Sequence, residues 1–448
     1  MIRRILIVLL VAVAALALFW WWQRREQAAR VPVAEVEGVN PRITPPRPTL
    51  LPTVHVAPAV GWKPGEAPTP APGLRVQAFA TGLDHPRWLL PLPNGDVLVA
   101  ESNAPPKEDK GGIRGFVQRL VMKRAGAGVA SADRITLLRD ADGDGVAETR
   151  TVLLAGLRSP FGMALVGGTL YVANTDALVR VPFTPGQTRV TARPERLVAL
   201  PAGPVNSHWT KNVLASPDGR RLYVTIGSNS NVGEKGMAVE AERARIWEVD
   251  AATGRHRTLA YGIRNPVGLA WEPTTRKLWT VSNERDELGP DIVPDYLTEV
   301  QFGGFYGWPW YYWGGYPDKR PKEADALDLQ QYVVRPDYAL GPHTASLGLT
   351  FADRARLGPR YADGAFVGQH GSWNRRPRSG YKVVFVAFRG GRPQGKPVDV
   401  LTGFLNGDGE ARGRPVGVEI DARGALLVAD DVGNAVWRVS PARAVAAR

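Results

Sequence analysis

The strongest constraint on the fold is a strand–turn–strand unit that recurs along the chain from residue 74 onward. Each unit has two short apolar strands, usually joined by an Asn-Gly, Asp-Gly or Gly-Gly type turn, and the second strand ends in polar residues. Tight turns of this kind fit the twist of antiparallel strands, so each unit predicts a β-hairpin. The six copies begin with HPRWLL (85–90), SPFGMAL (159–165), SHWTKNVL (207–214), RNPVGLAW (264–271), SLGLTF (346–351) and RPVGVEI (414–420).

Six β units at spacings of roughly 50 to 80 residues predict an all-β, six-bladed propeller over residues 74–448. A seven-bladed propeller with one degenerate blade and a pair of β-sandwiches remain as alternatives. A helical bundle is excluded, because the chain contains 49 glycines and 38 prolines, which disfavour long helices.

The polar residues that close the units should meet on one face of a propeller, where a ligand would bind. They are Glu101 and Asn103, Asn174 and Asp176, Ser228 and Asn229, Asn283 to Asp286, His370 to Arg375, and Asp430 and Asp431.

The N-terminal segment, residues 1–30, contains an uncharged apolar stretch from Ile5 to Trp22. This length is just sufficient to cross a bilayer as a helix, and Trp20 to Trp22 suit an interfacial aromatic belt. We expect an uncleaved membrane anchor. A cleaved signal segment is the alternative, although it would require small residues ahead of the cleavage site.

Residues 31–73 carry 11 prolines in 43 positions. That density favours an extended polyproline II conformation without a packed core. We therefore predict a Pro-rich linker between the anchor and the propeller, acting either as a semi-rigid stalk or as a disordered leader.

The formal net charge is +13, but no run of basic residues interleaved with aromatic residues is present. Nucleic-acid binding is therefore not expected, and an anionic ligand or surface is the better interpretation. The chain has no cysteine, which excludes disulfides, thiolate metal sites and covalent haem attachment on this chain.

Two further motifs have open interpretations. The acidic loop from Asp140 to Gly145, followed by Glu148, is either a calcium loop or a plain Asp-Gly turn, since Thr151 stands where an EF-hand requires glutamate. The aromatic run from Phe305 to Tyr316 is either packing beneath a long loop or a wall on which a sugar or planar cofactor stacks.

Histidine occurs only six times. His55 and His256 are expected to be solvated, whereas His85, His208, His343 and His370 begin or end repeat strands on the predicted ligand face. A neutral imidazole at such a place suits general-base chemistry near neutral pH, and His208 and His370 are the main candidates.

Several motifs together resemble the PQQ-dependent (pyrroloquinoline quinone) sugar dehydrogenases of the soluble glucose and sorbosone dehydrogenase type. The resemblance spans roughly residues 74–442 and is closest to the sorbosone and pyranose branch, because the glucose branch carries an acidic residue where Ser228 stands here. The motifs, in order, are RNPVGLAW (264–271), SNERDELGPD (282–291), FGGFYGWPW (302–310), HTASLGLTF (343–351) and GQHGSWNR (368–375).

The resemblance implies a six-bladed propeller that binds PQQ and Ca²⁺ on its axis. His208 matches the family's catalytic base, and Arg264 and Asn265 match residues that contact the quinone. The segment Asn283 to Asp286 matches the calcium ligands, which are largely main-chain carbonyls, so that Asn283, Arg285 and Asp286 are the metal candidates. The remaining expected cofactor contacts are Lys211, His370, Trp373, Asn374, Arg375 and Arg414.

The function expected from the resemblance is oxidation of a sugar, or of a sugar-derived aldehyde, by hydride transfer to PQQ on the periplasmic face of the membrane. Electrons would leave to an external acceptor, either a membrane quinone or a cytochrome. Two other hypotheses stay open, since a propeller fold alone does not define function: a calcium-dependent lactonase-type hydrolase, and a propeller used only for binding.

Overall fold

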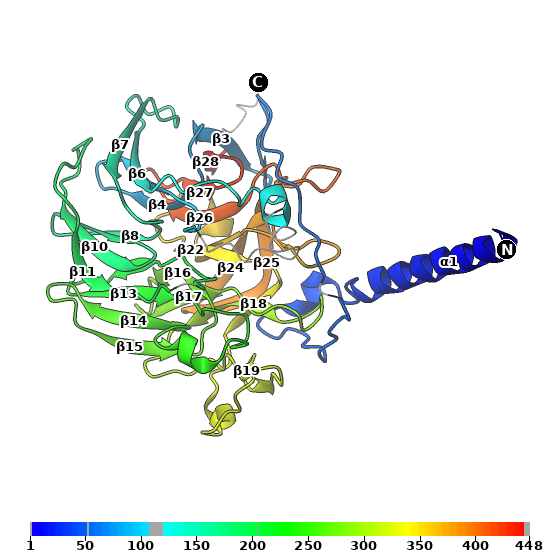
Figure 1. The fold of residues 1–448 in the computed structure, drawn as a ribbon. Helices are drawn as coiled ribbons and strands as arrows, with labels where there is room; N and C mark the ends of the chain where they lie inside the picture. The colour runs from blue at the N-terminus through cyan, green and yellow to red at the C-terminus, as the bar shows by residue number, and fades with distance from the viewer. Residues whose placement is uncertain (1, 52, 107–119, 204, 443–448) are drawn as a thin grey trace.

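The computed structural model describes residues 2–51, 53–106, 120–203 and 205–442. Six antiparallel β-sheets are arranged around a common axis (Figure 1). The innermost strands β4, β8, β12, β16, β22 and β26 form a closed ring, in which each strand contacts the next and β26 returns to β4. The predicted six-bladed propeller is therefore confirmed.

The blades are numbered in chain order, and each runs from the innermost strand outward. Blade 1 contains β4 (Pro86–Pro91), β5 (Val97–Glu101), β6 (Arg134–Arg139) and β7 (Thr149–Ala155). Blade 2 contains β8 (Met163–Val166), β9 (Thr169–Ala173), β10 (Ala177–Pro182) and β11 (Glu195–Ala199). Blade 3 contains β12 (Val213–Ala215), β13 (Arg221–Ile226), β14 (Arg245–Asp250) and β15 (His256–Tyr261).

The last three blades recruit strands from elsewhere in the chain. Blade 4 contains β16 (Pro266–Trp271), β17 (Leu278–Ser282), β18 (Pro294–Glu299) and β21 (Tyr338–Pro342), with β1 (Glu37–Gly38) at its edge. Blade 5 contains β22 (Ser346–Phe351), β23 (Gly364–Gln369), β24 (Lys382–Arg389) and β25 (Arg392–Thr402), with β2 (Thr69–Pro70) at its edge. Blade 6 contains β26 (Pro415–Ile420), β27 (Leu426–Asp430), β28 (Ala435–Pro441) and β3 (Leu74–Thr81).

Blade 6 closes the ring, because its outer strand β3 comes from the start of the propeller and pairs with the last strand, β28. The small hairpin β19 (Tyr311–Tyr312) and β20 (Tyr316–Pro317) lies in the long connection between β18 and β21. Short 3₁₀ turns occupy Val33–Val36, Met237–Glu240, Leu329–Tyr332 and Pro359–Tyr361.

Glycines in the innermost strands let neighbouring blades approach closely at the axis. A Cβ atom on Gly348 of β22 would lie 2.2 Å from the carbonyl oxygen of Val416 in β26. A Cβ atom on Gly417 of β26 would lie 2.9 Å from the carbonyl oxygen of Arg87 in β4. Both separations are too short for any larger residue, so the glycine in SLGLTF and in RPVGVEI is needed for packing between blades.

Residues 31–73, which the sequence predicts as a stalk or a disordered leader, instead lie against the propeller. The segment supplies the edge strands β1 and β2, and the side chains of Val36 and Ala57 are completely buried. Prolines are compatible with this arrangement, because an edge strand leaves half of its N–H groups unpaired. The blue segment after α1 in Figure 1 follows this path across the propeller. We call residues 31–73 the leader.

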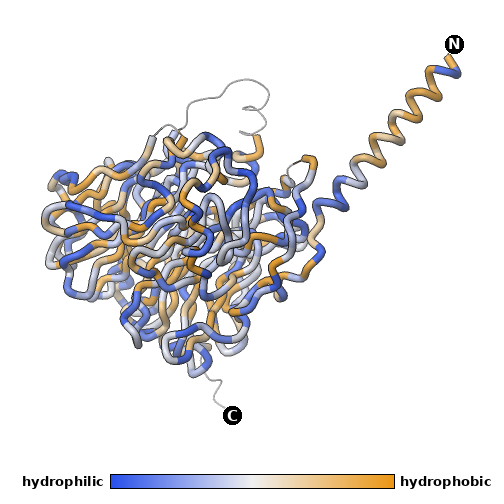
Figure 2. Tube along the Cα trace, turned by 90° about the horizontal axis from the view of Figure 1, so that it is seen from below, coloured by the Kyte–Doolittle hydropathy of each residue, from blue (hydrophilic) through white to orange (hydrophobic). Residues whose placement is uncertain are grey.

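The helix α1 (Ile2–Glu26) projects from the propeller as a separate rod (Figure 1). Figure 2 shows that it is apolar over most of its length. Among the described residues it is the helix that is long and apolar enough to cross a membrane, a test that signal sequences also pass.

The leader is held partly by Trp62. Its Nε1 atom donates a hydrogen bond of 2.7 Å to Asp430, which is completely buried, and its ring packs on Phe404 and Trp437. We predict that Trp62→Ala lowers the free energy of unfolding by about 3 kcal/mol, because the substitution removes a packed ring and leaves a buried carboxylate short of a donor. Denaturant unfolding followed by circular dichroism measures this change.

The matched control is Trp20→Ala, since Trp20 is 54% exposed on α1 and should contribute nothing to propeller stability. Equal unfolding curves for Trp62→Ala and the parent protein would contradict an integral role for the leader.

Candidate axial site

Of the polar residues predicted at the strand ends, Asn103, His370 and Asp431 line a cavity of about 1190 Å³ at one end of the axis, and the other polar residues named there are not part of its lining. His85 precedes β4, Arg87 lies within it, and Arg414 precedes β26, while His370 follows β23 and Asp431 follows β27. All five residues line this cavity, which we call the axial pocket. The pocket thus forms where innermost strands begin and second strands end.

Asp431 is the centre of a charged cluster in the axial pocket. Its carboxylate accepts hydrogen bonds from Arg87 Nη1 and from His370 Nε2, the latter at 2.9 Å. Burial alone would raise the pKa of Asp431, but the neighbouring His370 and Arg87 hold it far below its usual range. Burial also lowers the pKa of His370, against the opposing attraction of Asp431.

Arg414 provides unused hydrogen-bond donors in the axial pocket. Its side chain is almost fully buried, and its guanidinium carbon lies 5.1 Å from the centre of the Tyr381 ring. Among the described residues, neither Nε nor Nη2 of Arg414 has a hydrogen-bond partner, and the same holds for Nε of Arg87. Buried guanidinium donors without partners are costly, so this pocket is suited to an anionic ligand.

A second group of predicted residues surrounds Gly227, which follows β13. The Nδ1 atom of His208 lies 2.8 Å from the carbonyl oxygen of Ser228, which can only accept a hydrogen bond. The proton of the neutral ring is therefore on Nδ1, and Nε2 keeps a lone pair. Burial, followed by the charge of Arg264, lowers the pKa of His208 well below its usual value. His208 is thus a neutral ring with a free acceptor nitrogen.

Asn265 lies on the other side of Gly227. A Cβ atom at Gly227 would lie 2.3 Å from Asn265 Oδ1 and 2.6 Å from His208 Cβ, so glycine is required for this approach. Asn265 Oδ1 is buried and has no hydrogen-bond partner among the described residues. Lys211 is completely buried beneath this group, with Nζ 3.3 Å from the carbonyl oxygen of Trp209, and burial lowers its pKa well below the usual value.

The predicted calcium segment, Asn283 to Asp286, already satisfies its oxygen atoms with protein donors. Arg264 donates to the carbonyl oxygens of Asn283 (3.2 Å) and Glu284 (2.8 Å), and it lies 3.4 Å from the Asp286 carboxylate. The carbonyl oxygen of Asp286 accepts from Asn231 and Arg320. The donor set therefore does not fit a Ca²⁺ site here, because the guanidinium group of Arg264 occupies the position that a cation would take.

The side chain of Arg285 is used for hydrogen bonds within the protein, and its Nε donates to the Glu284 carboxylate at 2.9 Å. Its guanidinium is completely buried and donates to the carbonyl oxygens of Pro309 and Tyr311, both at 2.8 Å. The aromatic run from Phe305 to Tyr316 is correspondingly buried at most of its positions. Of the two interpretations of that run, packing fits the structure, and a stacking wall does not.

The motif GQHGSWNR (368–375) divides between ligand-facing and structural roles. His370 and Trp373 line the axial pocket, and Asn374 donates a 2.8 Å hydrogen bond to Asp286. Arg375 is buried away from the pocket, where its nitrogens donate to the carbonyl oxygens of Pro290, Pro377 and Val31. The predicted carboxylate-binding role of Arg375 therefore does not fit, because its donors are used by main-chain carbonyl groups, one of which, that of Val31, belongs to the leader.

The role of Arg87 is not predicted from the sequence, and His85 and Asp431 are predicted only to lie on the ligand face. Their position in the repeat could have identified them, because His85 and Arg87 lie at the start of the first repeat unit as Arg414 lies at the start of the last. His55, expected to be solvated, is instead half-buried, with Nδ1 2.9 Å from the carbonyl oxygen of Arg375.

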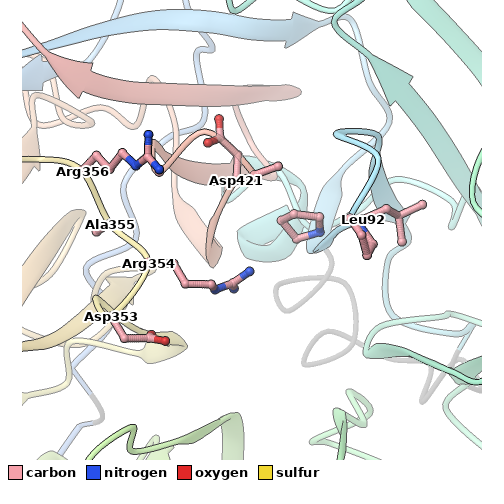
Figure 3. Close-up of a pocket in the computed structure, with 10 residues that line it drawn as sticks. Leu92, Asp353, Arg354, Ala355, Arg356 and Asp421 are labelled. Atoms are coloured by element: carbon pink, nitrogen blue, oxygen red, sulfur yellow. The ribbon is translucent and has the colours of Figure 1, made fainter.

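Two other features lie apart from the axial pocket. Asp140, Asp142, Asp144 and Glu148 bring carboxylate oxygens within 4.8 Å of one another in the connection from β6 to β7, where Arg423 also pairs with Asp140. A cavity of about 500 Å³ lies among the hairpin turns, and Figure 3 shows Arg354, Arg356 and Asp421 around it. These turns are at the ends of β4, β22 and β26 away from the axial pocket.

The fold and this site define a class: six-bladed propellers with a basic axial pocket, in which guanidinium nitrogens of Arg414 and Arg87 lack partners among the described residues. A family model described as TrAA12-like matches residues 68–294 and 317–442. The chain belongs to the TrAA12-like family, and the predicted resemblance to PQQ-dependent sugar dehydrogenases is confirmed.

Named relatives agree with this assignment. The chain is 28% identical over 221 residues to a pyrroloquinoline quinone-dependent pyranose dehydrogenase of Coprinopsis cinerea, a match that covers 40% of this chain and 30% of that protein. It is 24% identical over 317 residues to a pyrroloquinoline quinone-dependent sugar dehydrogenase of Hypocrea jecorina, covering 64% of this chain and 66% of that protein.

Among solved structures, the holo PQQ domain of the Coprinopsis cinerea pyranose dehydrogenase superposes with a TM-score of 0.66 at 22% identity. The superposition covers 86% of this chain and 100% of that domain, so the two share the fold over the whole propeller.

The lowered pKa of His208 predicts a pH dependence of stability. Below about pH 6.5 the unfolded chain protonates this histidine and the folded chain does not, so the free energy of unfolding falls as the pH falls. The slope is at most about 1.4 kcal/mol per pH unit for one proton. We predict that His208→Gln flattens this slope between pH 7 and pH 5, measured by denaturant unfolding at each pH.

If His208→Gln keeps the slope of the parent protein, the ring of His208 is not protected from protonation.

Proposed function

We propose that the protein is a PQQ-dependent oxidoreductase that oxidises a sugar, or a sugar-derived aldehyde, in the axial pocket. The observation that carries the proposal is the set of buried, unpaired guanidinium nitrogens of Arg414 and Arg87 in a pocket of about 1190 Å³. PQQ is a tricarboxylate, and carboxylates are the natural partners of such donors. Membership of the TrAA12-like family supports the same cofactor.

Arg414 and Arg87 would hold cofactor carboxylates, and Trp373 would flank the ring system from the pocket edge. His370 would be oriented by Asp431, its hydrogen-bond partner at 2.9 Å. Bound PQQ would supply a two-electron acceptor for hydride from the substrate carbon.

His208 would act as the general base. Its Nδ1–H group is fixed by the Ser228 carbonyl oxygen, so Nε2 can accept the proton of the substrate hydroxyl. The lowered pKa keeps the ring neutral and therefore competent as a base near neutral pH. Asn265 would present its unpaired Oδ1 beside the base, and Arg264 would position the segment 283–286. No step requires a calcium ion at that segment.

The redox cycle would end at a separate electron carrier, either a membrane quinone or a cytochrome, since the chain has no cysteine for covalent haem attachment. Helix α1 would anchor the protein in the membrane, with the propeller on the periplasmic side.

A lactonase-type hydrolase is less well supported. Its chemistry would need carboxylate or histidine metal ligands at the axis, whereas among the described residues the only such cluster lies in the β6–β7 connection.

Arg414→Ala should weaken PQQ binding by roughly 10- to 100-fold, because the substitution removes a charge-assisted hydrogen bond worth about 1.5–3 kcal/mol. Titration of the purified protein with PQQ, followed by the absorbance of the quinone, measures the dissociation constant. The control is Arg356→Ala, since Arg356 lies by the other cavity (Figure 3) and should leave the constant unchanged. If both variants bind PQQ with the same dissociation constant, Arg414 is not part of the cofactor site.

His208→Ala should lower kcat by ~10²-fold or more while PQQ binding stays close to that of the parent protein, because the ring acts in proton transfer. The assay is reduction of a soluble dye by a panel of aldoses and sorbosone with PQQ added. Full turnover of the variant would show that another group is the base. Failure of the parent protein to bind PQQ would refute the proposed function.

A further inference from the structure

The junction between α1 and the propeller is rigid. The backbone N–H of Ala29 donates to the carbonyl oxygen of Arg376 at 2.7 Å, and that of Arg30 donates to the Asp291 carboxylate at 3.0 Å. The side chain of Gln27 donates to the carbonyl oxygen of Leu51, and that of Arg47 donates to the carbonyl oxygen of Ala28. Helix α1 therefore passes into the leader without a flexible spacer.

The three tryptophans near the end of α1 place the expected lipid interface next to this junction. Trp20, Trp21 and Trp22 are 54%, 59% and 46% exposed. Tryptophan at the end of an apolar helix lies at the level of the lipid headgroups. Gln27 lies five positions after Trp22, which is only about 7–8 Å along a helix axis. The surface of the propeller around the junction must then lie close to the bilayer.

That surface exposes apolar side chains. Leu50 is 71% exposed, Val54 48%, Leu120 58%, Met122 44% and Trp373 40%. Val54, Met122 and Trp373 also line the axial pocket, so these apolar side chains surround its mouth. Clusters of exposed apolar side chains on a soluble domain mark contact with a partner or a membrane.

The same surface is strongly basic. Lys123 and Arg124 lie on the helical turn 120–124 beside Leu120 and Met122, and both are exposed. Arg376 accepts the junction hydrogen bond of Ala29, and after burial the main influence lowering its pKa is the charge of Arg24. Burial lowers the pKa of Arg378, Tyr381 opposes this, and the charges of Arg376, Arg414 and Arg124 lower the pKa further. Positive side chains gathered in this way attract anionic lipid headgroups.

We propose that the face formed by residues 50–51, 53–54, 120–124 and 373–378, here called the docking face, lies on the surface of an anionic phospholipid bilayer. The leucine, valine and methionine side chains enter the headgroup region, and Lys123 and Arg124 contact lipid phosphates, while Trp373 stays at the edge of the axial pocket. The mouth of the axial pocket then opens at the membrane surface. The inference rests on the anchoring role proposed for α1 and is independent of the oxidation chemistry.

The absence of cysteine allows single probes to be placed cleanly. Full-length Leu50→Cys and Met122→Cys, labelled with nitrobenzoxadiazole, are reconstituted into vesicles of phosphatidylcholine and phosphatidylglycerol. The control is Val146→Cys, which is similarly exposed (41%) but lies in the β6–β7 connection. We expect a blue shift, and quenching by doxyl-labelled lipid, for the probes at 50 and 122, and neither effect at 146.

The charged part of the docking face is tested by Lys123→Glu with Arg124→Glu in the Leu50→Cys background. Quenching at position 50 should fall by at least half, and vesicles of phosphatidylcholine alone should give a similar loss. The matched control, Arg354→Glu with Arg356→Glu at the other cavity, should keep full quenching.

Vesicle flotation is measured on every sample, so that loss of docking can be distinguished from loss of membrane anchoring. If the protein floats with the vesicles but the probes at 50 and 122 are no more quenched than the probe at 146, docking is overturned and the anchor is retained. No flotation would overturn the anchor and docking together. Dye reduction does not enter the readout, so failure of the proposed oxidation would leave this result unaffected.

Discussion

The close approach of the six innermost strands at the propeller axis is the constraint on which the rest of the structure depends. At Gly348 and Gly417 the neighbouring backbone lies so near that no Cβ atom can be accommodated. This packing fixes where each innermost strand begins, and hence where His85, Arg87 and Arg414 enter the axial pocket. The pocket is therefore a consequence of how the ring closes and does not depend on a separate domain.

The leader is also held in place by specific packing, at the outer part of the propeller. Trp62 reaches Asp430 in blade 6, and Arg375 reaches Val31, so the leader is attached at the propeller by buried hydrogen bonds to charged groups. Such bonds are stronger than neutral ones and costly to break when buried. The leader in turn connects the start of the propeller to α1, so that the axial pocket lies close to the helix that is the candidate membrane anchor.

The basic residues that produce the excess positive charge have different roles, which depend on the groups that surround each side chain. Around Asp431 and Asp286, arginines are paired with carboxylates in the protein interior. Arg414 is buried, lines the axial pocket and has two guanidinium nitrogens without partners among the described residues, and these observations support its proposed role in ligand binding. Lys123 and Arg124 are exposed among apolar side chains, and this distinguishes a surface suited to lipid. Net charge alone does not separate these roles, because it carries no information about burial.

Much of the fold and part of the site could be predicted from the sequence, because those features depend on local patterns. The alternation of apolar residues and the tight turns predicted the hairpins, and the number of hairpins predicted six blades. The uncharged apolar stretch predicted α1. The positions of His208 and His370 at strand ends followed from the repeat. The roles of Arg87, Arg264 and Arg375 did not, since their partners lie far along the chain: Arg87 pairs with Asp431, 344 residues away, and Arg375 with Pro290, 85 residues away. A long side chain can turn toward a ligand or toward a carbonyl group, and only the packing of distant segments decides which donors remain free.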